Sequence, residues 1–139
     1  MRFTPLICFE SVFPELCAEG VKHGSQLFVN ITNDGWFGNT PGPYQHAQMC
    51  IARAVEFRRC LVRSANSGVS MLVTPSGEVS HQIALNQTDV MTVPVVKLSG
   101  VTFYAKHGDT PLLLVSALCV LLAVALSRQG GMPESRRRN

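Results

Sequence analysis

Charged side chains are scarce in this chain: only 15% of its residues are Asp, Glu, Lys or Arg, whereas 46% are apolar. An apolar content this high excludes a disordered chain. A charged content this low is unusual for a domain that is surrounded only by water. The net charge is +3, and arginines gather near the carboxyl terminus. Because the rest of the chain is close to neutral, no nucleic-acid partner is expected. A length of 139 residues predicts one domain with a modest core.

The sequence also lacks the cysteine spacings of disulfide frameworks and metal sites. Its cysteines are Cys8, Cys17, Cys50, Cys60 and Cys119. They are odd in number and include no CxxC pair, so structural disulfides are not expected. Cys50 and Cys60 together with His46 fit no structural zinc template. Neither a metal nor any other cofactor is expected.

One uncharged stretch is long enough to cross a membrane. Residues 110–127 are apolar on every helical face, and a helix of about 18 residues reaches roughly 27 Å. A buried core helix is the alternative, but in so small a domain it would keep a polar stripe. Arg128 and further arginines follow directly. The positive-inside rule therefore predicts a basic cytoplasmic tail, 128–139, and an extracytoplasmic domain, 1–109.

No apolar signal segment follows Met1. A domain outside the membrane needs an export signal, so this topology predicts that the working protein has further chain before residue 1.

The first half of the domain has the pattern of an α/β fold. An apolar strand over 5–9, a helix over 11–23 and a second strand over 26–32 predict a βαβ unit. A loop rich in Gly and Pro, 33–43, leads to a helix over 44–59 whose apolar residues recur at helical spacing.

The second half has the pattern of an antiparallel meander. Short strands are expected over 61–65, 69–73 and 79–85, because Asn-Ser-Gly and Pro-Ser-Gly turns separate them. One more strand is expected over 89–96.

Cys8 stands where nucleophiles are often presented, at the end of an apolar strand with a helix start predicted at Ser11. A thiol there gains thiolate character from the helix dipole and from free N–H groups. The alternative is a small buried hydrophobic residue, as most free cysteines are. Glu10 is either a buried carboxylate that acts at the thiol or an acidic residue favoured in a first helical turn.

Two further features lie between the predicted helices. The loop 33–43 carries the only tryptophan, Trp36, beside Phe37. Glycines on both sides would let this pair move as a lid or enter lipid, whereas the alternative is a packed Ω-loop. His46 is a possible base for Cys8. Its predicted place near a helix amino terminus argues against that role, because the imidazolium form is disfavoured there.

Five linked motifs resemble one enzyme family. They are Ile7-Cys8-Phe9-Glu10, Thr32-Asn33-Asp34-Gly35-Trp36-Phe37-Gly38, Gly42-Pro43-Tyr44-Gln45-His46, Arg53-Ala54-Val55-Glu56 and Arg63-Ser64-Ala65-Asn66-Ser67-Gly68. Their order and spacing resemble the apolipoprotein N-acyltransferases, which are membrane-bound members of the nitrilase, or carbon–nitrogen hydrolase, superfamily. The resemblance extends through the final apolar helix.

The resemblance implies a fold and a set of site residues. The fold would be an α/β one, the carboxyl-terminal half of an αββα sandwich, followed by one transmembrane helix. Cys8 would be the nucleophile and Glu10 a supporting carboxylate. Residues implied to contact substrate are Phe9, Trp36, Phe37 and Glu56. The family usually has Tyr where this chain has Phe9, so a hydrogen bond from that hydroxyl is lost. The family's Glu base and Lys match no residue of this chain.

The implied reaction moves an acyl chain from a membrane phospholipid to Cys8, and then to the amino-terminal amine of a diacylglyceryl-cysteine apolipoprotein. It takes place at the bacterial inner membrane, with the domain on the periplasmic side. Because the Glu and Lys are missing, we expect this chain to be inactive alone and to need the amino-terminal half of the enzyme. Two alternatives remain: a nitrilase-type amidase of small soluble amides, and a non-catalytic remnant or split-gene half.

Overall fold

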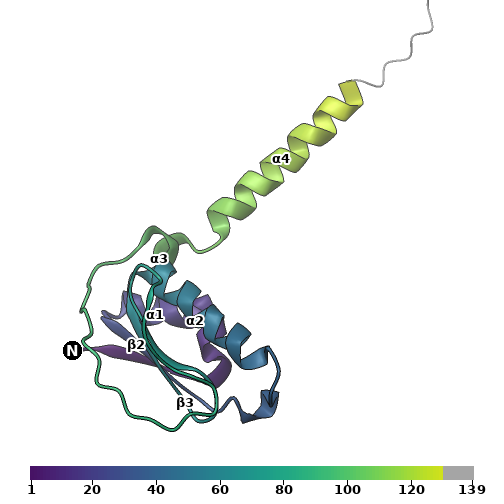
Figure 1. Cartoon of the computed structure of the whole chain (residues 1–139). Coiled ribbons are helices and arrows are strands. Elements are labelled where there is room, and N and C mark those ends of the chain that lie inside the picture. The colour runs from purple at the N-terminus through teal and green to yellow at the C-terminus, as the bar shows by residue number, and fades with distance from the viewer. Residues whose placement is uncertain (130–139) are drawn as a thin grey trace, which may run out of the picture. The chain divides into compact units, whose positions relative to one another are not determined.

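The computed structural model describes residues 1–129 (Figure 1). By its internal contacts the chain divides into two units, Met1–Gly108 and Asp109–Asn139.

The first unit is built on one mixed sheet of five strands in the order β1-β2-β3-β4-β5. The strands are β1 (Phe3–Ile7), β2 (Leu27–Thr32), β3 (Cys60–Ala65), β4 (Ser70–Val73) and β5 (Val79–Ile83). The first three run parallel, and β3, β4 and β5 pair antiparallel. The predicted α/β class and the predicted meander are both confirmed.

Helices cover one face of this sheet (Figure 1). They are α1 (Pro14–Lys22), α2 (Gly42–Phe57) and the short α3 (Phe103–His107), and two 3-10 turns, η1 (Cys8–Val12) and η2 (Gly35–Phe37), follow β1 and β2. The core lies between these helices and the sheet, where Leu6, Phe28, Cys50, Phe57 and Leu61 are almost fully buried. This core gives α2 a fixed position over the carboxyl ends of the parallel strands.

The connection from β1 to α1 differs from the prediction. We expected the helix to begin at Ser11, but the turn η1 occupies Cys8–Val12 and α1 begins at Pro14. Proline at the first helical position suits a helix start, since its missing N–H would have no partner there. The effect of a helix dipole is confined to the first turn of the helix. In α1 that turn begins at Pro14, after η1, and not directly after Cys8 as we expected.

The strand expected over 89–96 is absent, so that prediction is wrong. The segment is extended, and Val93 and Val95 pack on the second face of the sheet against Leu27, Cys60 and Leu72. Its side chains alternate between half-buried and exposed, as in a strand. A β-strand also needs backbone hydrogen bonds to a neighbouring strand. Within residues 1–129 no strand lies beside it.

Arg59 links the end of this extended segment, at Gly100, to the loop before β2, at Ser25. Its guanidinium is buried and donates to the carbonyls of Ser25 at 2.7 Å and Gly100 at 2.5 Å. It also donates to the carbonyls of Phe57 and Arg58 at the end of α2. A cation is favoured at that end because the helix macrodipole is negative there.

The second unit contains α4 (Thr110–Gln129), an apolar helix. Within the described residues it is the one helix that is long and apolar enough to cross a membrane, with a mean hydropathy of 2.4 over Thr110–Arg128. The basic tail predicted over 128–139 lies outside the described residues from position 130 onward.

The close approach of α1 to β1 gives a stability prediction. A Cβ on Gly20 would lie 2.0 Å from Thr4 Oγ1 and 3.0 Å from Thr4 Cβ. Alanine normally stabilises a helix relative to glycine by about 0.5–1 kcal/mol. We expect Gly20→Ala to lower the free energy of unfolding instead, because overpacking costs about 1–3 kcal/mol. Denaturant unfolding of the 139-residue chain in detergent micelles measures this.

The matched control is the same change in a Thr4→Ala background, where the nearest clashing atom is gone. The loss on Gly20→Ala should shrink there by about 1 kcal/mol or more. An equal loss in both backgrounds would show that the contact with Thr4 is not its cause.

Candidate active site

Cys8 adopts an unusual backbone conformation. It is the first residue of η1 and has φ of 51°, in the left-handed region that non-glycine residues rarely occupy. Such a conformation costs about 1–3 kcal/mol and persists only where the surrounding structure holds it. Here the Cys8 carbonyl accepts hydrogen bonds from Ser11 Oγ at 3.2 Å and Asn30 Nδ2 at 3.1 Å. The side chain is half-buried at the carboxyl end of β1.

Glu10 closes the same turn. Its carboxylate accepts a hydrogen bond of 2.7 Å from the backbone N–H of Ile7. Of the two interpretations of the sequence, this geometry matches an acidic residue that caps the first turn of a short helix. The side chain is exposed, whereas the alternative required a buried carboxylate.

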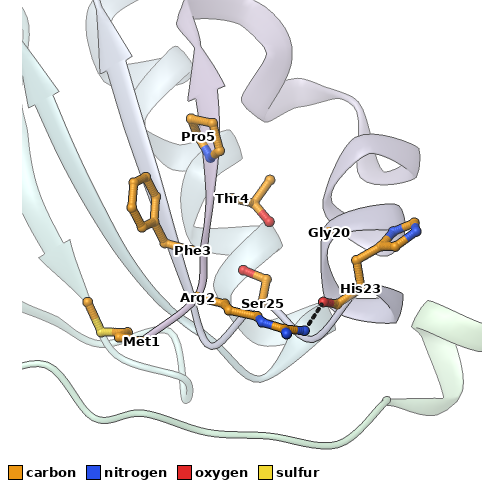
Figure 2. Close-up of a pocket in the computed structure, with 8 residues that line it drawn as sticks. All are labelled: Met1, Arg2, Phe3, Thr4, Pro5, Gly20, His23 and Ser25. Carbon is orange, nitrogen blue, oxygen red and sulfur yellow. Dashed lines mark hydrogen bonds between the residues drawn. The ribbon is translucent and has the colours of Figure 1, made fainter.

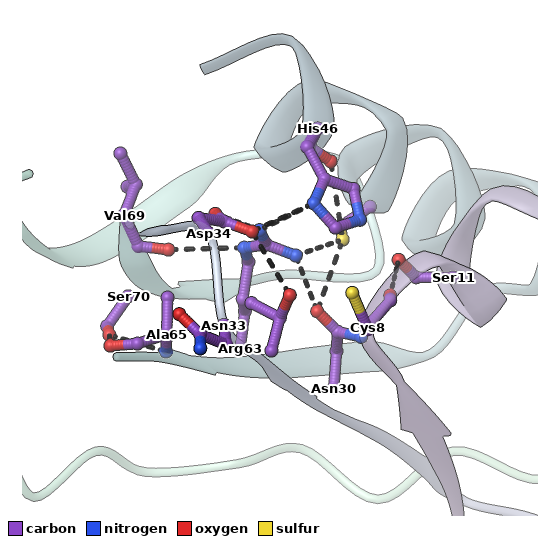
Figure 3. A network of polar contacts seen from close by, with 12 residues as sticks. Cys8, Ser11, Asn30, Asn33, Asp34, His46, Arg63, Ala65, Val69 and Ser70 are labelled. Carbon is purple, nitrogen blue, oxygen red and sulfur yellow. Dashed lines mark hydrogen bonds and ion pairs between the residues drawn. The ribbon is translucent and has the colours of Figure 1, made fainter. Parts of the chain in front are cut away.

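A buried polar cluster lies behind Cys8 (Figure 3). Arg63 from β3 donates through Nη2 to Asp34 Oδ2 at 2.6 Å, and through Nη1 to Asn30 Oδ1 at 2.5 Å. Asp34 follows β2, and both side chains of the ion pair are fully buried. Asn30 links the cluster to β1, because its Nδ2 donates to the carbonyls of Leu6 and Cys8. Side chains from β2, β3 and the loop after β2 thus meet main-chain carbonyls at the end of β1, at the carboxyl ends of the parallel strands, where α/β proteins place ligand sites.

His46 from the second turn of α2 completes this cluster. Its Nδ1 lies 3.0 Å from Asp34 Oδ1 and 3.2 Å from Arg63 Nη2. The ring is 2% exposed, and its Nε2 is buried without a hydrogen-bond partner among the described residues.

Aromatic rings cover the imidazole. The centroid of the His46 ring lies 5.6 Å from that of Phe9 and 6.0 Å from that of Phe37. Phe9 also meets Phe13 edge to face at 5.9 Å. Trp36 does not join them, since it is 88% exposed on η2. Of the four residues that the resemblance implies at the substrate site, Phe9 and Phe37 both lie against the His46 ring.

Glu56 lies farther along α2. Ten residues of helix separate it from His46, about 15 Å along the axis. Its carboxylate pairs with Arg53 at 2.8 Å, and Arg53 Nη1 donates to the carbonyl of Val12 at 2.9 Å. The pair joins α2 to the end of η1, so within this chain Glu56 is linked to the Cys8 turn through Arg53.

Asn30 and Arg63 were not among the predicted site residues, although each interrupts an apolar strand. A buried strand with one polar side chain is a usable signal, because that side chain must find partners inside. Within residues 1–129 no group of three or more His, Cys, Asp or Glu side chains is placed to hold a metal ion.

The Arg63–Asp34 pair gives the second prediction. We expect Arg63→Met to lower the free energy of unfolding by about 3–5 kcal/mol, because Asp34 would stay buried without its cation. Adding Asp34→Asn should recover part of the loss. Arg58→Met is the control, since Arg58 is exposed, and should stay within about 0.5 kcal/mol of the parent. Equal losses at both arginines in denaturant unfolding would contradict the assignment.

The buried thiols give a chemical prediction. Burial raises the pKa of the Cys17 thiol from 9.0 to about 12, although the nearby Arg53 opposes the shift. The folded state therefore binds this proton more tightly, a stabilisation that is complete below pH 9.0 and is lost as pH rises toward about 12.

At pH 9.0 we expect iodoacetamide to label half-buried Cys8 and to leave Cys17 unlabelled until denaturant is added. Peptide mass spectrometry reports both sites, and rapid labelling of Cys17 in the folded chain would contradict its burial.

The chain is similar in sequence and fold to known proteins. Residues 1–104 match the carbon-nitrogen hydrolase family. The chain is 42% identical over 129 residues to an apolipoprotein N-acyltransferase of Geobacter metallireducens, covering 92% of this chain and 25% of that protein. It is 36% identical over 121 residues to the enzyme of that name from Shewanella oneidensis, covering 87% of this chain and 23% of the relative.

Solved structures show the same fold. Saccharomyces cerevisiae Nit3, a member of the nitrilase superfamily, superposes with a TM-score of 0.52 at 19% identity, over 62% of this chain and 34% of that one. A carbon-nitrogen hydrolase from Helicobacter pylori gives 0.52 at 12% identity, over 59% and 36%. The chain thus spans about a quarter of the curated relatives' length, and over residues 1–104 it belongs to the carbon–nitrogen hydrolase family.

Proposed function

We propose that this chain supplies the nucleophile of a membrane-bound N-acyltransferase. The observation that carries the proposal is the placement of Cys8, a half-buried thiol on a left-handed turn held by Asn30 and Ser11. In the first step the Cys8 sulfur attacks an ester carbonyl and forms a thioester, while the ester C–O bond breaks and the rest of the phospholipid leaves as an alcohol that takes up the thiol's proton. In the second step an amine attacks the thioester and releases the thiol.

The acyl donor is a membrane phospholipid, and the acceptor is the amino-terminal amine of a diacylglyceryl-cysteine apolipoprotein. The names of the relatives support this choice, and so does an apolar helix suited to a membrane span. Both substrates are lipid-anchored, so an enzyme that acts on them benefits from sitting in the same bilayer.

The aromatic residues around Cys8 suit an acyl chain. Phe9 and Phe13 are each about half exposed, at 49% and 50%, and their rings meet edge to face. Exposed apolar groups gathered in this way mark sites that bind lipid or apolar ligands. Trp36 does not join this pair, but it is almost fully exposed on η2 and so is open to lipid. We assign Phe9, Trp36 and Phe37 to contact with the acyl chain. Glu10 holds the turn that carries the thiol, and Glu56 supports the same turn through Arg53.

The chain spans about a quarter of the relatives' length, and we assign the rest of the catalytic domain to sequence outside this segment. On the second face of the sheet, Phe3, Ile7 and Ile31 are 54–55% exposed, and apolar surface of this kind needs a cover. Strand β1 stands at the edge of the sheet. Beside it is a hollow of about 420 Å³, whose lining includes Thr4, Gly20 and His23 (Figure 2).

The extended segment 89–97 also supports contact with the rest of the catalytic domain. Met91, Val93 and Val95 are half-buried, and the residues between them are exposed. Within the described residues the segment forms no backbone–backbone hydrogen bonds. Its side chains alternate as in a strand, and its backbone N–H and C=O groups can therefore pair with a strand from the rest of the domain.

We place the domain, residues 1–109, on the periplasmic side of the inner membrane. The span follows over 110–127, and the tail over 128–139 is cytoplasmic. The arginines of that tail support this orientation through the positive-inside rule.

The proposal is tested in a chimera, in which this chain replaces the matching segment of the Geobacter metallireducens relative. With phospholipid we expect mass spectrometry to find an acyl adduct on Cys8 that hydroxylamine removes. Cys8→Ser should abolish the thioester, whereas Cys119→Ala should keep it, since Cys119 belongs to the apolar helix α4 and not to the first unit. The 139-residue chain alone should form no adduct, because it lacks the residues implied to activate the thiol.

An adduct on another residue, or transfer that survives Cys8→Ser, would rule out the proposed nucleophile. Hydrolysis of a small soluble amide without acyl loading from phospholipid would favour an amidase instead.

A further inference from the structure

We propose that α3 and the residues just before it form a surface that contacts the headgroup layer of the membrane. We call this surface the juxtamembrane patch and define it as Val101, Phe103, Lys106 and His107. The proposal rests on the membrane span of the proposed function, but it does not depend on the reaction at Cys8. The partner is the phospholipid bilayer, as a surface that supports the first unit and not as a substrate.

The local sequence fixes both ends of this short helix. Thr102 caps its start, because its Oγ1 accepts a hydrogen bond of 3.1 Å from the N–H of Ala105. The same hydroxyl donates to the carbonyl of Glu56 near the end of α2 at 2.8 Å. Gly108 ends the helix with φ of 54°, where glycine is favoured, and its N–H donates to the carbonyl of Tyr104 at 2.7 Å. The helix therefore has a defined position against α2.

The inner side of α3 packs into the core of the first unit. Ala105 is almost fully buried in the main core cluster, and the Tyr104 ring meets Phe57 edge to face at 5.7 Å. Just before the helix, the carbonyl of Gly100 accepts a hydrogen bond from the buried Arg59. Because packing and a buried cation hold the helix, the same side chains always face outward.

The outer side of α3 carries exposed apolar groups. Phe103 is 67% exposed, and Val101 just before the helix is 41% exposed. The Phe103 ring lies against the ring of His107, with centroids 4.5 Å apart, and Lys106 is also exposed. Isolated apolar side chains on a surface are common and need no partner. The case for a partner therefore depends on where in the chain these side chains lie.

Chain length alone keeps the patch close to the membrane surface. Only Gly108 and Asp109 separate α3 from α4, which begins at Thr110. Three steps between successive Cα atoms span at most about 11 Å, so the end of α3 stays within that distance of the span, whatever direction α4 takes. The headgroup layer is about 5–8 Å deep on each side of a bilayer. With α4 in the membrane, the patch therefore lies at or near this layer.

The chemistry of the patch suits a lipid surface. Helices that lie in a membrane surface combine Phe, Trp or Leu with Lys or Arg, and they bury the apolar groups between headgroups and acyl chains. Phe103 provides such an apolar group, and the long side chain of Lys106 can direct its ammonium toward a phosphate. Lysine is depleted in protein–protein interfaces, so its presence favours lipid over a protein partner. Asp109 offsets the charge of Lys106, so apolar contact and not net attraction holds the patch.

The patch gives the first unit a second attachment to the bilayer. A linker of two residues, one of them glycine, leaves a domain free to rotate about the end of its span. Since α3 is fixed to the core, contact of its outer side with lipid restricts that rotation for the whole first unit. The inference thus concerns how the domain is held over its lipid substrates.

The proposal is tested with a photocrosslinker in the chimera described above, in native membranes. Benzoylphenylalanine bonds covalently to nearby C–H groups when it is illuminated. For Phe103→benzoylphenylalanine and Val101→benzoylphenylalanine we expect mass spectrometry to find phospholipid attached at the substituted position. His81→benzoylphenylalanine is the matched control, since His81 is likewise exposed but lies on β5, outside the patch. It should give no lipid adduct.

Both substituted positions of the patch are exposed, so each variant should unfold at the same temperature as the unmutated chimera. Cross-links from position 103 to another polypeptide segment, in place of lipid, would show that protein covers the patch and would overturn the proposal. The absence of any adduct at positions 101 and 103 would overturn it as well, because the patch would then face water. An equal lipid adduct at position 81 would show that contact with lipid is not specific to the patch.

The readout is independent of acyl transfer. A lipid adduct at position 103 in a chimera that forms no thioester on Cys8 would support the patch and refute the proposed reaction. A chimera that loads Cys8 but gives no lipid adduct at positions 101 and 103 would do the reverse. Recovery of the chimera in the soluble fraction would refute both the span and the patch.

Discussion

The buried ion pair between Arg63 and Asp34 is the constraint on which the rest of the site depends. Both side chains are fully enclosed, and burying two ions costs several kcal/mol each before any compensation. The cost is offset only where the remaining donors and acceptors of the pair are also satisfied. Asn30, Thr32 and His46 supply those groups. The pair therefore dictates which polar residues must stand at the carboxyl ends of the strands and in the first turns of α2.

The same pair explains the geometry around it. A Cβ on Gly68 would lie 2.1 Å from Asp34 Oδ2, so the turn after β3 can approach the carboxylate only as glycine. On the other side, Asn30 uses its oxygen for Arg63 and its nitrogen for the carbonyls of Leu6 and Cys8. Its amide therefore transmits the position of the ion pair to the left-handed turn at Cys8. The strain in that turn is sustained by interactions well inside the fold, as is common at active sites.

Much of this fold follows from local patterns, and the exceptions have physical causes. Periodicity and turn residues placed the parallel strands, the meander and the apolar helix, because each signal acts over a few neighbouring residues. The apolar pattern did not predict the turn η1, because it does not show where the chain leaves β1. That change of direction takes place over Cys8–Val12, and α1 begins only at Pro14. The cluster was missed because its members lie up to 33 residues apart, between Asn30 and Arg63, and meet only when β2 and β3 pair. The strand expected over 89–96 failed for a different reason: its alternating pattern is present, but no strand within the described residues lies beside it.

This division between local and distant determinants bears on how catalysis is distributed. The residues that hold Cys8 and His46 in place lie within one sheet and the helix above it, so their geometry is set by this chain. The cation and the base implied for the first step match no residue here. Under the proposed function, a thiolate needs a nearby cation to form readily, so acyl loading of Cys8 draws on residues outside this chain. What the chain itself supplies is the turn that carries the thiol. The buried ion pair holds that turn through Asn30, whose amide contacts both Arg63 and the Cys8 carbonyl.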